Sequence, residues 1–146
     1  VKIVTKSGTI EAEADFFIDT TGDGELIFMT GCDYQLGRES DGLCQPMTTC
    51  FRVSGINDEL FLNELKSLQQ KYKEYQAENK ISNPRENILV FGGLGDGVYH
   101  FNTTRVIKHN PVDPVEVSHA EMIARQQVGE MVRFFKENSK RNFGRK

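Results

Sequence analysis

The chain has 146 residues, of which 38% are hydrophobic and 27% are charged, and its 18 Lys and Arg residues against 21 Asp and Glu residues give a formal net charge of −3. This composition is typical of a soluble globular protein with one modest core, and the near-neutral balance provides no broad basic surface for nucleic acid. No stretch approaches the roughly 20 apolar residues that a membrane span needs.

The three cysteines have no paired spacing, so the sequence predicts neither a disulfide framework nor a metal site of the zinc type. A reducing compartment, with the cytoplasm as the default location, follows from this cysteine usage. The chain opens at Val1 inside a strand-like segment, without an initiator Met or a signal-like leader. We therefore expect it to be a piece of a longer protein, with apolar surface at the cut that would favour self-association.

The first third of the chain predicts a hairpin, a buried strand and a short helix. Residues 2–5 and 9–14 flank a Lys-Ser-Gly turn, and the alternating apolar residues of the second strand indicate one half-buried face. Residues 16–19 read Phe-Phe-Ile-Asp, which is typical of a fully buried strand. A glycine-containing turn then leads into a short helix at residues 25–29.

Residues 47–53 form another strand candidate, and a long helix follows it. Asn57 or Asp58 would cap this helix. Its apolar residues recur at alternating spacings of four and three, which predicts a helix lying on one surface. They are Phe61, Leu65, Leu68, Tyr72 and Tyr75.

The last third predicts a second hairpin and a second long helix. Residues 88–91 and 98–101 flank a glycine-rich tip at 92–97. Ser118 and Glu121 have the spacing of a capping box at the start of the final helix. Its predicted buried stripe is Ala120, Ala124, Val128, Met131 and Phe135. Residues 136–146 are a basic tail that we expect to fray. The resulting class is α+β, with β-hairpins in a mixed antiparallel sheet and two longer amphipathic helices.

The turn from Asp19 to Gly24 is the segment richest in chemistry. Glycines at 22 and 24 permit positive φ and a close approach to the backbone, and a following helix N-terminus offers N–H groups to an anion. Asp23 could accept hydrogen bonds from sugar hydroxyls, or it could cap the helix. A purely structural strand–helix turn fits the same residues.

Calcium is a further interpretation of this turn, since Asp19, Asp23 and Gly24 fall at positions one, five and six of an EF-hand-like loop. Position twelve is Thr30, however, where a bidentate Glu is required. The pattern therefore disfavours calcium.

A family resemblance then emerges from several segments taken in order. Residues 17–26, with 31–34 after them, resemble the "IDATGDGDL…AGAPY" segment of a family of FAD-dependent oxidoreductases. Further similar pieces follow in the same order as in that family. They lie at residues 36–39, 41–48, 51–55, 100–106 and 118–126.

The resemblance implies part of a split FAD-binding flavoprotein fold. Residues 1–31 resemble the distal part of the FAD-binding domain, and 32–146 a substrate-side or cap region. By that resemblance FAD is the cofactor, and the activity is hydride transfer between flavin and a small molecule. The cofactor-contacting residues would be Asp19, Thr21, Gly22, Asp23 and Gly24.

The chain departs from the family pattern because it lacks the G-x-G-x-x-G fingerprint that receives the FAD pyrophosphate. The glycine-rich tip at 92–97 fails on spacing and is followed by a strand pattern. The missing N-terminal FAD-binding half is therefore the expected partner. Without it, we expect weak FAD binding and no activity.

Arg105 and Asn102 are the candidate substrate-binding residues, because a guanidinium can form a forked pair with a substrate carboxylate. A structural salt bridge of Arg105 is the alternative. The cysteines are either a redox pair near the flavin or small buried residues, and His100 or His109 could transfer a proton. The sequence identifies no catalytic residue. A non-enzymatic interaction module that uses the Phe61–Tyr75 helix face is the alternative function.

Overall fold

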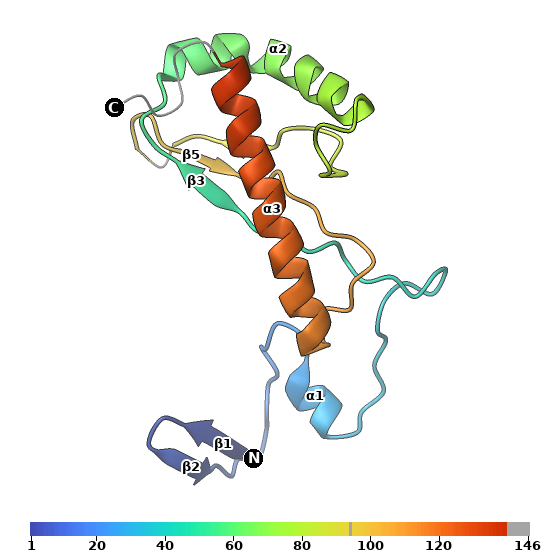
Figure 1. Ribbon diagram of the computed structural model, residues 1–146. Coiled ribbons are helices and arrows are strands. Elements are labelled where there is room, and N and C mark those ends of the chain that lie inside the picture. The colour runs from blue at the N-terminus through green and yellow to red at the C-terminus, as the bar shows by residue number, and fades with distance from the viewer. Residues whose placement is uncertain (94, 140–146) are drawn as a thin grey trace. The chain divides into compact units, whose positions relative to one another are not determined.

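The computed structural model describes residues 1–93 and 95–139. The chain divides into two compact units, Val1–Gln35 (unit 1) and Leu36–Lys146 (unit 2) (Figure 1). The predicted boundary lies between residues 31 and 32, and the assignment of the two parts to a FAD-binding domain and a substrate region stays a prediction.

Unit 1 contains the predicted hairpin and the predicted short helix. Strands β1 (Lys2–Thr5) and β2 (Gly8–Glu11) pair antiparallel, with Lys2 opposite Glu11 and Thr5 opposite Gly8. Helix α1 spans Glu25–Met29. All three elements are short, so unit 1 has no second layer on which to bury apolar residues.

The buried strand predicted at residues 16–19 is wrong. This segment is irregular, and Phe16, Phe17 and Ile18 are 89%, 51% and 84% exposed. The half-buried face predicted for the second strand is wrong for Ile10 and Ala14, which are exposed, while Ala12 is half-buried; the strand itself ends at Glu11. Both errors have one cause: apolar patterning predicts burial, but unit 1 supplies no surface that could cover these residues.

Unit 2 is built on a small antiparallel sheet of order β3-β5-β4. Its strands are β3 (Phe51–Val53), β4 (Val90–Phe91) and β5 (Tyr99–Phe101). Pairing of β4 with β5 confirms the second hairpin. The strand predicted at 47–53 is shorter in the structure, and Met47 instead forms an isolated bridge with Val106.

Helix α2 (Asp58–Ala77) begins as predicted, with Asn57 as its cap: the Asn57 side chain accepts a hydrogen bond from Leu60 N at 3.0 Å. Of the predicted stripe, Phe61, Leu68 and Tyr72 are buried in unit 2. This face packs inside the unit itself, which removes the basis for an interaction module that uses it.

Helix α3 (Pro114–Asn138) begins earlier than the predicted capping box. Asp113 is its cap and accepts hydrogen bonds from Val115 N and Glu116 N, and Pro114 fits the first helical turn, where a backbone N–H is not needed. Ser118 therefore lies within the helix, and its hydroxyl donates to Pro114 O. Fraying was predicted for residues 136–146, but α3 continues through Asn138, so the prediction is wrong for the start of this tail. Residues 140–146 lie outside the described residues.

The main core of unit 2 joins both long helices to the sheet and is rich in aromatic rings. Phe51 and Phe101 stack with centroids 5.0 Å apart, and Phe101 also contacts Phe135 at 5.1 Å. The buried members are Ile56, Phe61, Leu68, Tyr72, Ile81, Ile88, Tyr99, Phe101, Met131, Phe134 and Phe135. Along the predicted α3 stripe, Val128 is only half-buried, whereas Gln127 and Glu130 are buried.

Among the described residues, none of the helices has both the length and the apolar character required to span a bilayer.

Candidate functional site

The Asp19 carboxylate organises the turn between residues 19 and 27 of unit 1. One oxygen accepts hydrogen bonds from the Thr21 N–H at 2.9 Å and the Thr21 hydroxyl at 2.6 Å. The other accepts from Ile27 N at 2.9 Å, in the first turn of α1. The Thr21 hydroxyl in turn accepts from Glu25 N at 3.0 Å. The side chains of Asp19 and Thr21, which lie before the helix in the chain, thus bind backbone N–H groups of the first turn of α1.

This network corrects the expectation that the α1 N-terminus is open to an anion. The Glu25 and Ile27 N–H groups, which an anion would use, already bind side chains of the turn. The same hydrogen bonds hold the pKa of Asp19 below its usual value, with the Thr21 hydroxyl the largest cause and the Ile27 N–H the next. Asp19 is therefore engaged in structure and has little capacity left for a ligand.

Asp23 and the two glycines beside it remain available. Within the described part of the chain, the Asp23 carboxylate accepts no hydrogen bond, and the N–H groups of Gly22 and Gly24 have no acceptor. Gly24 has φ 71°, a conformation that favours glycine, and a Cβ there would lie 4.0 Å from Asp19 Oδ2. The turn therefore presents one carboxylate and two backbone donors.

Arg105, in unit 2, forms an ion pair with Glu86: Nη1 lies 2.6 Å from Oε1. The Arg105 side chain is only 24% exposed, whereas Glu86 is 73% exposed. Hydrogen bonds from the Glu86 backbone N–H and from Arg105 lower the pKa of Glu86. The structural salt bridge considered for Arg105 is thus present, but its partner, Glu86, is an exposed surface residue rather than a core residue.

Asn102, the other predicted substrate residue, lies just after β5. Its backbone N–H donates to Leu89 O at 2.9 Å, whereas its side-chain oxygen is buried without a hydrogen-bond partner. The Nε of Arg85 is likewise buried and unpartnered. A buried polar atom without a partner costs free energy, and a bound polar ligand is one way to satisfy it. No hydrogen bond between the described atoms joins Asn102 to Arg105.

The family model for FAD dependent oxidoreductases matches residues 1–145. The chain belongs to this family. The predicted resemblance is thereby confirmed. No curated protein and no solved structure matches the chain.

Membership of the FAD dependent oxidoreductase family implies FAD, and the exposed turn fits one edge of such a cofactor. Asp23 can accept a hydrogen bond from a ribitol or ribose hydroxyl, and the N–H groups of Gly22 and Gly24 can donate to a polar oxygen. The sequence has no G-x-G-x-x-G to receive the pyrophosphate. The residues present therefore fit a contributing edge and not a complete binding site.

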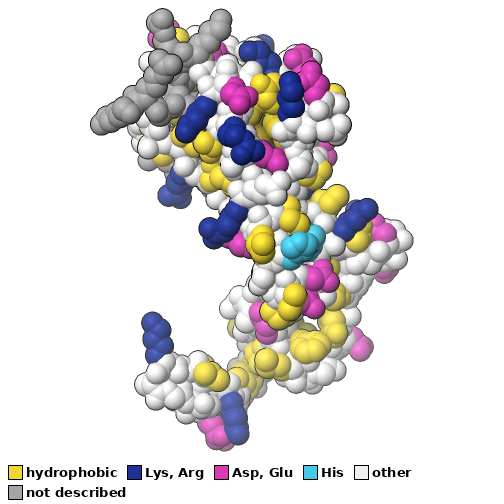
Figure 2. Space-filling view, viewed as in Figure 1, with side chains coloured by type: hydrophobic (Ala, Val, Ile, Leu, Met, Phe, Trp, Pro, Cys, Tyr) yellow, Lys and Arg dark blue, Asp and Glu magenta, His cyan; other side chains and the backbone are white. Residues whose placement is uncertain are grey.

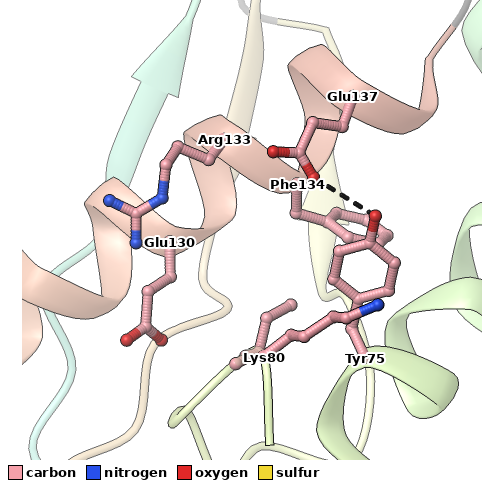
Figure 3. A pocket seen from close by; sticks show the side chains of 7 residues that line it. Tyr75, Lys80, Glu130, Arg133, Phe134 and Glu137 are labelled. Atoms are coloured by element: carbon pink, nitrogen blue, oxygen red, sulfur yellow. Dashed lines mark hydrogen bonds between the residues drawn. The ribbon is translucent and has the colours of Figure 1, made fainter. Parts of the chain in front are cut away.

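A surface pocket of about 350 Å³ in unit 2 was not anticipated from the sequence. It lies between the end of α2, the following turn and the second half of α3, and Figure 3 shows the Tyr75 ring between Lys80 and Glu137. The Tyr75 hydroxyl donates to Glu137 at 3.2 Å, and Lys80 Nζ lies 5.1 Å from the ring centre. The residues that line the pocket come from two segments far apart in the sequence, so no local motif predicts the pocket.

The cysteines differ from the prediction that they are small buried residues, since Cys32 and Cys50 are exposed and Cys44 is half-buried. All three thiols are free. His100 is half-buried in β5 against the Phe91 ring, at a centroid distance of 6.2 Å. No cluster of three or more His, Cys, Asp or Glu side chains among the residues that the structure describes could hold a metal ion.

Proposed function

We propose that the chain contributes one edge of a FAD site and a substrate-binding region to an oxidoreductase that acts on a small molecule carrying a carboxylate. Residues 1–31 would belong to the FAD-binding domain, and 32–146 to the substrate side. An N-terminal FAD-binding half containing G-x-G-x-x-G would complete the site. The observation that carries the proposal is the family match over residues 1–145.

The cofactor edge is the turn from Asp19 to Gly24. Asp23 would accept a hydrogen bond from a cofactor hydroxyl, while Gly22 and Gly24 let the cofactor approach the backbone. Asp19 and Thr21 would act by fixing the turn, because their hydrogen bonds hold the start of α1. When bound, FAD supplies the ring that exchanges a hydride with the substrate.

Arg105 would bind the substrate carboxylate. A carboxylate oxygen of Glu86 already lies 2.6 Å from the Arg105 guanidinium, which supports the view that a substrate carboxylate could reach the same guanidinium. Because Glu86 is mostly exposed, its displacement into water costs little. Asn102, whose side-chain oxygen has no partner, would accept a hydrogen bond from the same substrate.

Exposed apolar residues of unit 1 support the proposal that another polypeptide segment packs against this unit. Phe16, Phe17, Ile18, Phe28 and Met29 are all exposed, and Figure 2 shows yellow hydrophobic side chains at the surface of the molecule. Large exposed apolar surfaces are usually interaction sites. We assign this one to the missing FAD-binding half, so the chain alone would self-associate and bind FAD weakly.

The cofactor test uses the protein expressed from its complete reading frame. We expect flavin absorbance bands after purification, and an Asp23→Ala variant should bind FAD at least about tenfold more weakly, equivalent to one lost charge-assisted hydrogen bond. Asp15→Ala is the control, since Asp15 is an exposed residue of the same unit. Absence of flavin bands even after FAD is added, or equal FAD affinity of the two variants, would overturn the proposal.

The substrate test measures anaerobic flavin reduction by a panel of small carboxylic acids. We expect reduction by a subset of acids, with a KM raised about tenfold or more in Arg105→Met, since a charge-assisted pair is lost. Arg38→Met is the control, because Arg38 pairs with Asp41 on the surface. If only uncharged analogues were turned over, or if KM changed equally in both variants, the proposal that Arg105 binds a substrate carboxylate would be wrong.

A further inference from the structure

Two of the three histidines lie in direct contact in unit 2. His109, in the segment before α3, places Nε2 at 3.3 Å from Nδ1 of His119, in the second turn of that helix. The ring centres are 5.3 Å apart and the rings are inclined at 54°. Both side chains reach the surface, so the pair is open to solvent.

The backbone fixes which nitrogen of His109 is available. Its Nδ1 lies 2.9 Å from Ile107 O. A carbonyl oxygen can only accept, so Nδ1 carries the proton of the neutral ring. The lone pair on His109 Nε2 therefore accepts a hydrogen bond from the Nδ1–H of His119. Metal-ligating histidines are commonly oriented in this way, with the second ring nitrogen donating to a backbone carbonyl.

The separation of the two nitrogens matches two ligands of one tetrahedral ion. At a Zn–N distance of about 2.0–2.1 Å, two ligands of a tetrahedral site lie about 3.3–3.4 Å apart. We propose that His109 Nε2 and His119 Nδ1 together bind a divalent transition metal ion such as Zn²⁺. The His119 proton would move from Nδ1 to the solvent-facing Nε2, so binding would release no proton.

The segment that carries His109 is held firmly against the start of α3. Asn110 N donates to Glu116 Oε2 at 2.6 Å, and Val112 N donates to Asn110 Oδ1 at 3.1 Å. Lys108, immediately before His109, has φ 62°, a left-handed conformation that costs free energy in a non-glycine residue. Such strain is retained only where the surroundings fix the chain, so the backbone that carries His109 is held in place before a metal arrives.

With two protein ligands and no third His, Cys, Asp or Glu side chain grouped with them in the described structure, water would fill the other positions. The site would therefore bind an exchangeable ion more weakly than a structural zinc site does. It is independent of the proposed flavin function.

The test titrates Zn²⁺ into the 146-residue chain after its thiols are alkylated, since free cysteines also bind zinc. Calorimetry should show one site, and long-range ¹H–¹⁵N spectra of the imidazoles should show His109 Nε2 and His119 Nδ1 shifting together. His109→Gln and His119→Gln should each weaken Zn²⁺ binding about tenfold or more. Mg²⁺ should not bind, because it prefers oxygen ligands.

The third histidine provides the matched control. His100 lies in β5 and takes no part in the pair, so His100→Gln should leave Zn²⁺ affinity unchanged. Circular dichroism checks that all three variants keep their helices. The proposal would be overturned if His109→Gln bound Zn²⁺ as tightly as the chain with all three histidines, or if His100→Gln lost as much Zn²⁺ affinity as His109→Gln. Absence of any imidazole shift on Zn²⁺ addition would overturn it as well.

Discussion

The Gln127 side chain pairs with the backbone of Arg105 through two hydrogen bonds. Its Oε1 accepts from Arg105 N at 2.8 Å, and its Nε2 donates to Arg105 O at 3.0 Å. A glutamine in α3 thus binds the extended segment after β5 much as a neighbouring strand would. These two bonds hold the Arg105 backbone in place against α3, so Gln127 stabilises the segment that carries Arg105.

Replacing Gln127 with Leu should lower the free energy of unfolding of unit 2 by about 2–4 kcal/mol, because two backbone groups lose their partners in a buried place. Urea denaturation followed by helix circular dichroism measures this. Gln70→Leu is the matched control: Gln70 is exposed on α2 and bonds only Glu74, so its loss should stay within about 0.5 kcal/mol. If both variants lose the same free energy of unfolding, the two hydrogen bonds from Gln127 to Arg105 contribute no more to stability than the exposed bond of Gln70.

The buried Glu130 carboxylate joins α3 to the turn after α2. It accepts hydrogen bonds from Ser82 N and from the Ser82 hydroxyl, each at 2.9 Å, and from Gln126 Nε2 at 3.2 Å. Glu130→Gln should lower the free energy of unfolding by about 1–3 kcal/mol, since an amide NH₂ faces donors that need an acceptor. Thermal unfolding of the variant checks this.

Glu137→Gln is the comparison for Glu130, because both residues border the pocket on α3. Glu137 is exposed and accepts one hydrogen bond from Tyr75, which an amide oxygen can replace. Its substitution should change the free energy of unfolding by less than about 0.5 kcal/mol. A similar loss in both variants would mean that the Ser82 contact contributes little.

Elements with complete local signals were predictable from the sequence. Helix α2 has a capping Asn57 and an apolar stripe, and the second hairpin has a glycine-rich tip between two apolar runs. In each case the signal and the interaction that satisfies it lie close together in the chain. The capping box at Ser118 was wrong because two local signals competed, and Asp113 with Pro114 provided the better start.

Features that depend on distant partners were not predictable. Burial of residues 16–19 requires a covering layer that unit 1 does not contain. Gln127 and Glu130 lie outside the predicted buried stripe of the final helix, yet both are buried and bind backbone groups far away in sequence. For the same reason, the sequence indicated the Asp19–Gly24 turn but not that Asp19 is occupied with Ile27 while Asp23 is free.

The Asp19 carboxylate should titrate below its ordinary value of 3.8, because its hydrogen bonds favour the charged form. Since the pKa is depressed in the folded turn, the stabilisation is present above pH 3.8 and is lost as the pH falls through the folded value. Carboxyl ¹³C chemical shifts measure this midpoint. Thr21→Val should move it towards 3.8, whereas Thr21→Ser, which keeps the hydroxyl, should not. Identical midpoints in the two variants would exclude the Thr21 hydroxyl as the cause.

Gly97 and Gly55 separate the cost of backbone conformation from the cost of a steric clash. Both have positive φ, +66° and +76°, but a Cβ on Gly97 would lie 2.5 Å from Ile56 O, whereas one on Gly55 would meet nothing within 4 Å. Gly55→Ala should therefore cost only the left-handed conformation, about 1–2 kcal/mol. Gly97→Ala should cost about 1–3 kcal/mol more, since Ile56 N and Gly97 O are also hydrogen-bonded at 3.1 Å and the two segments must separate. Urea denaturation of both variants measures the difference, and equal losses would show that the contact between residues 56 and 97 can relax without cost.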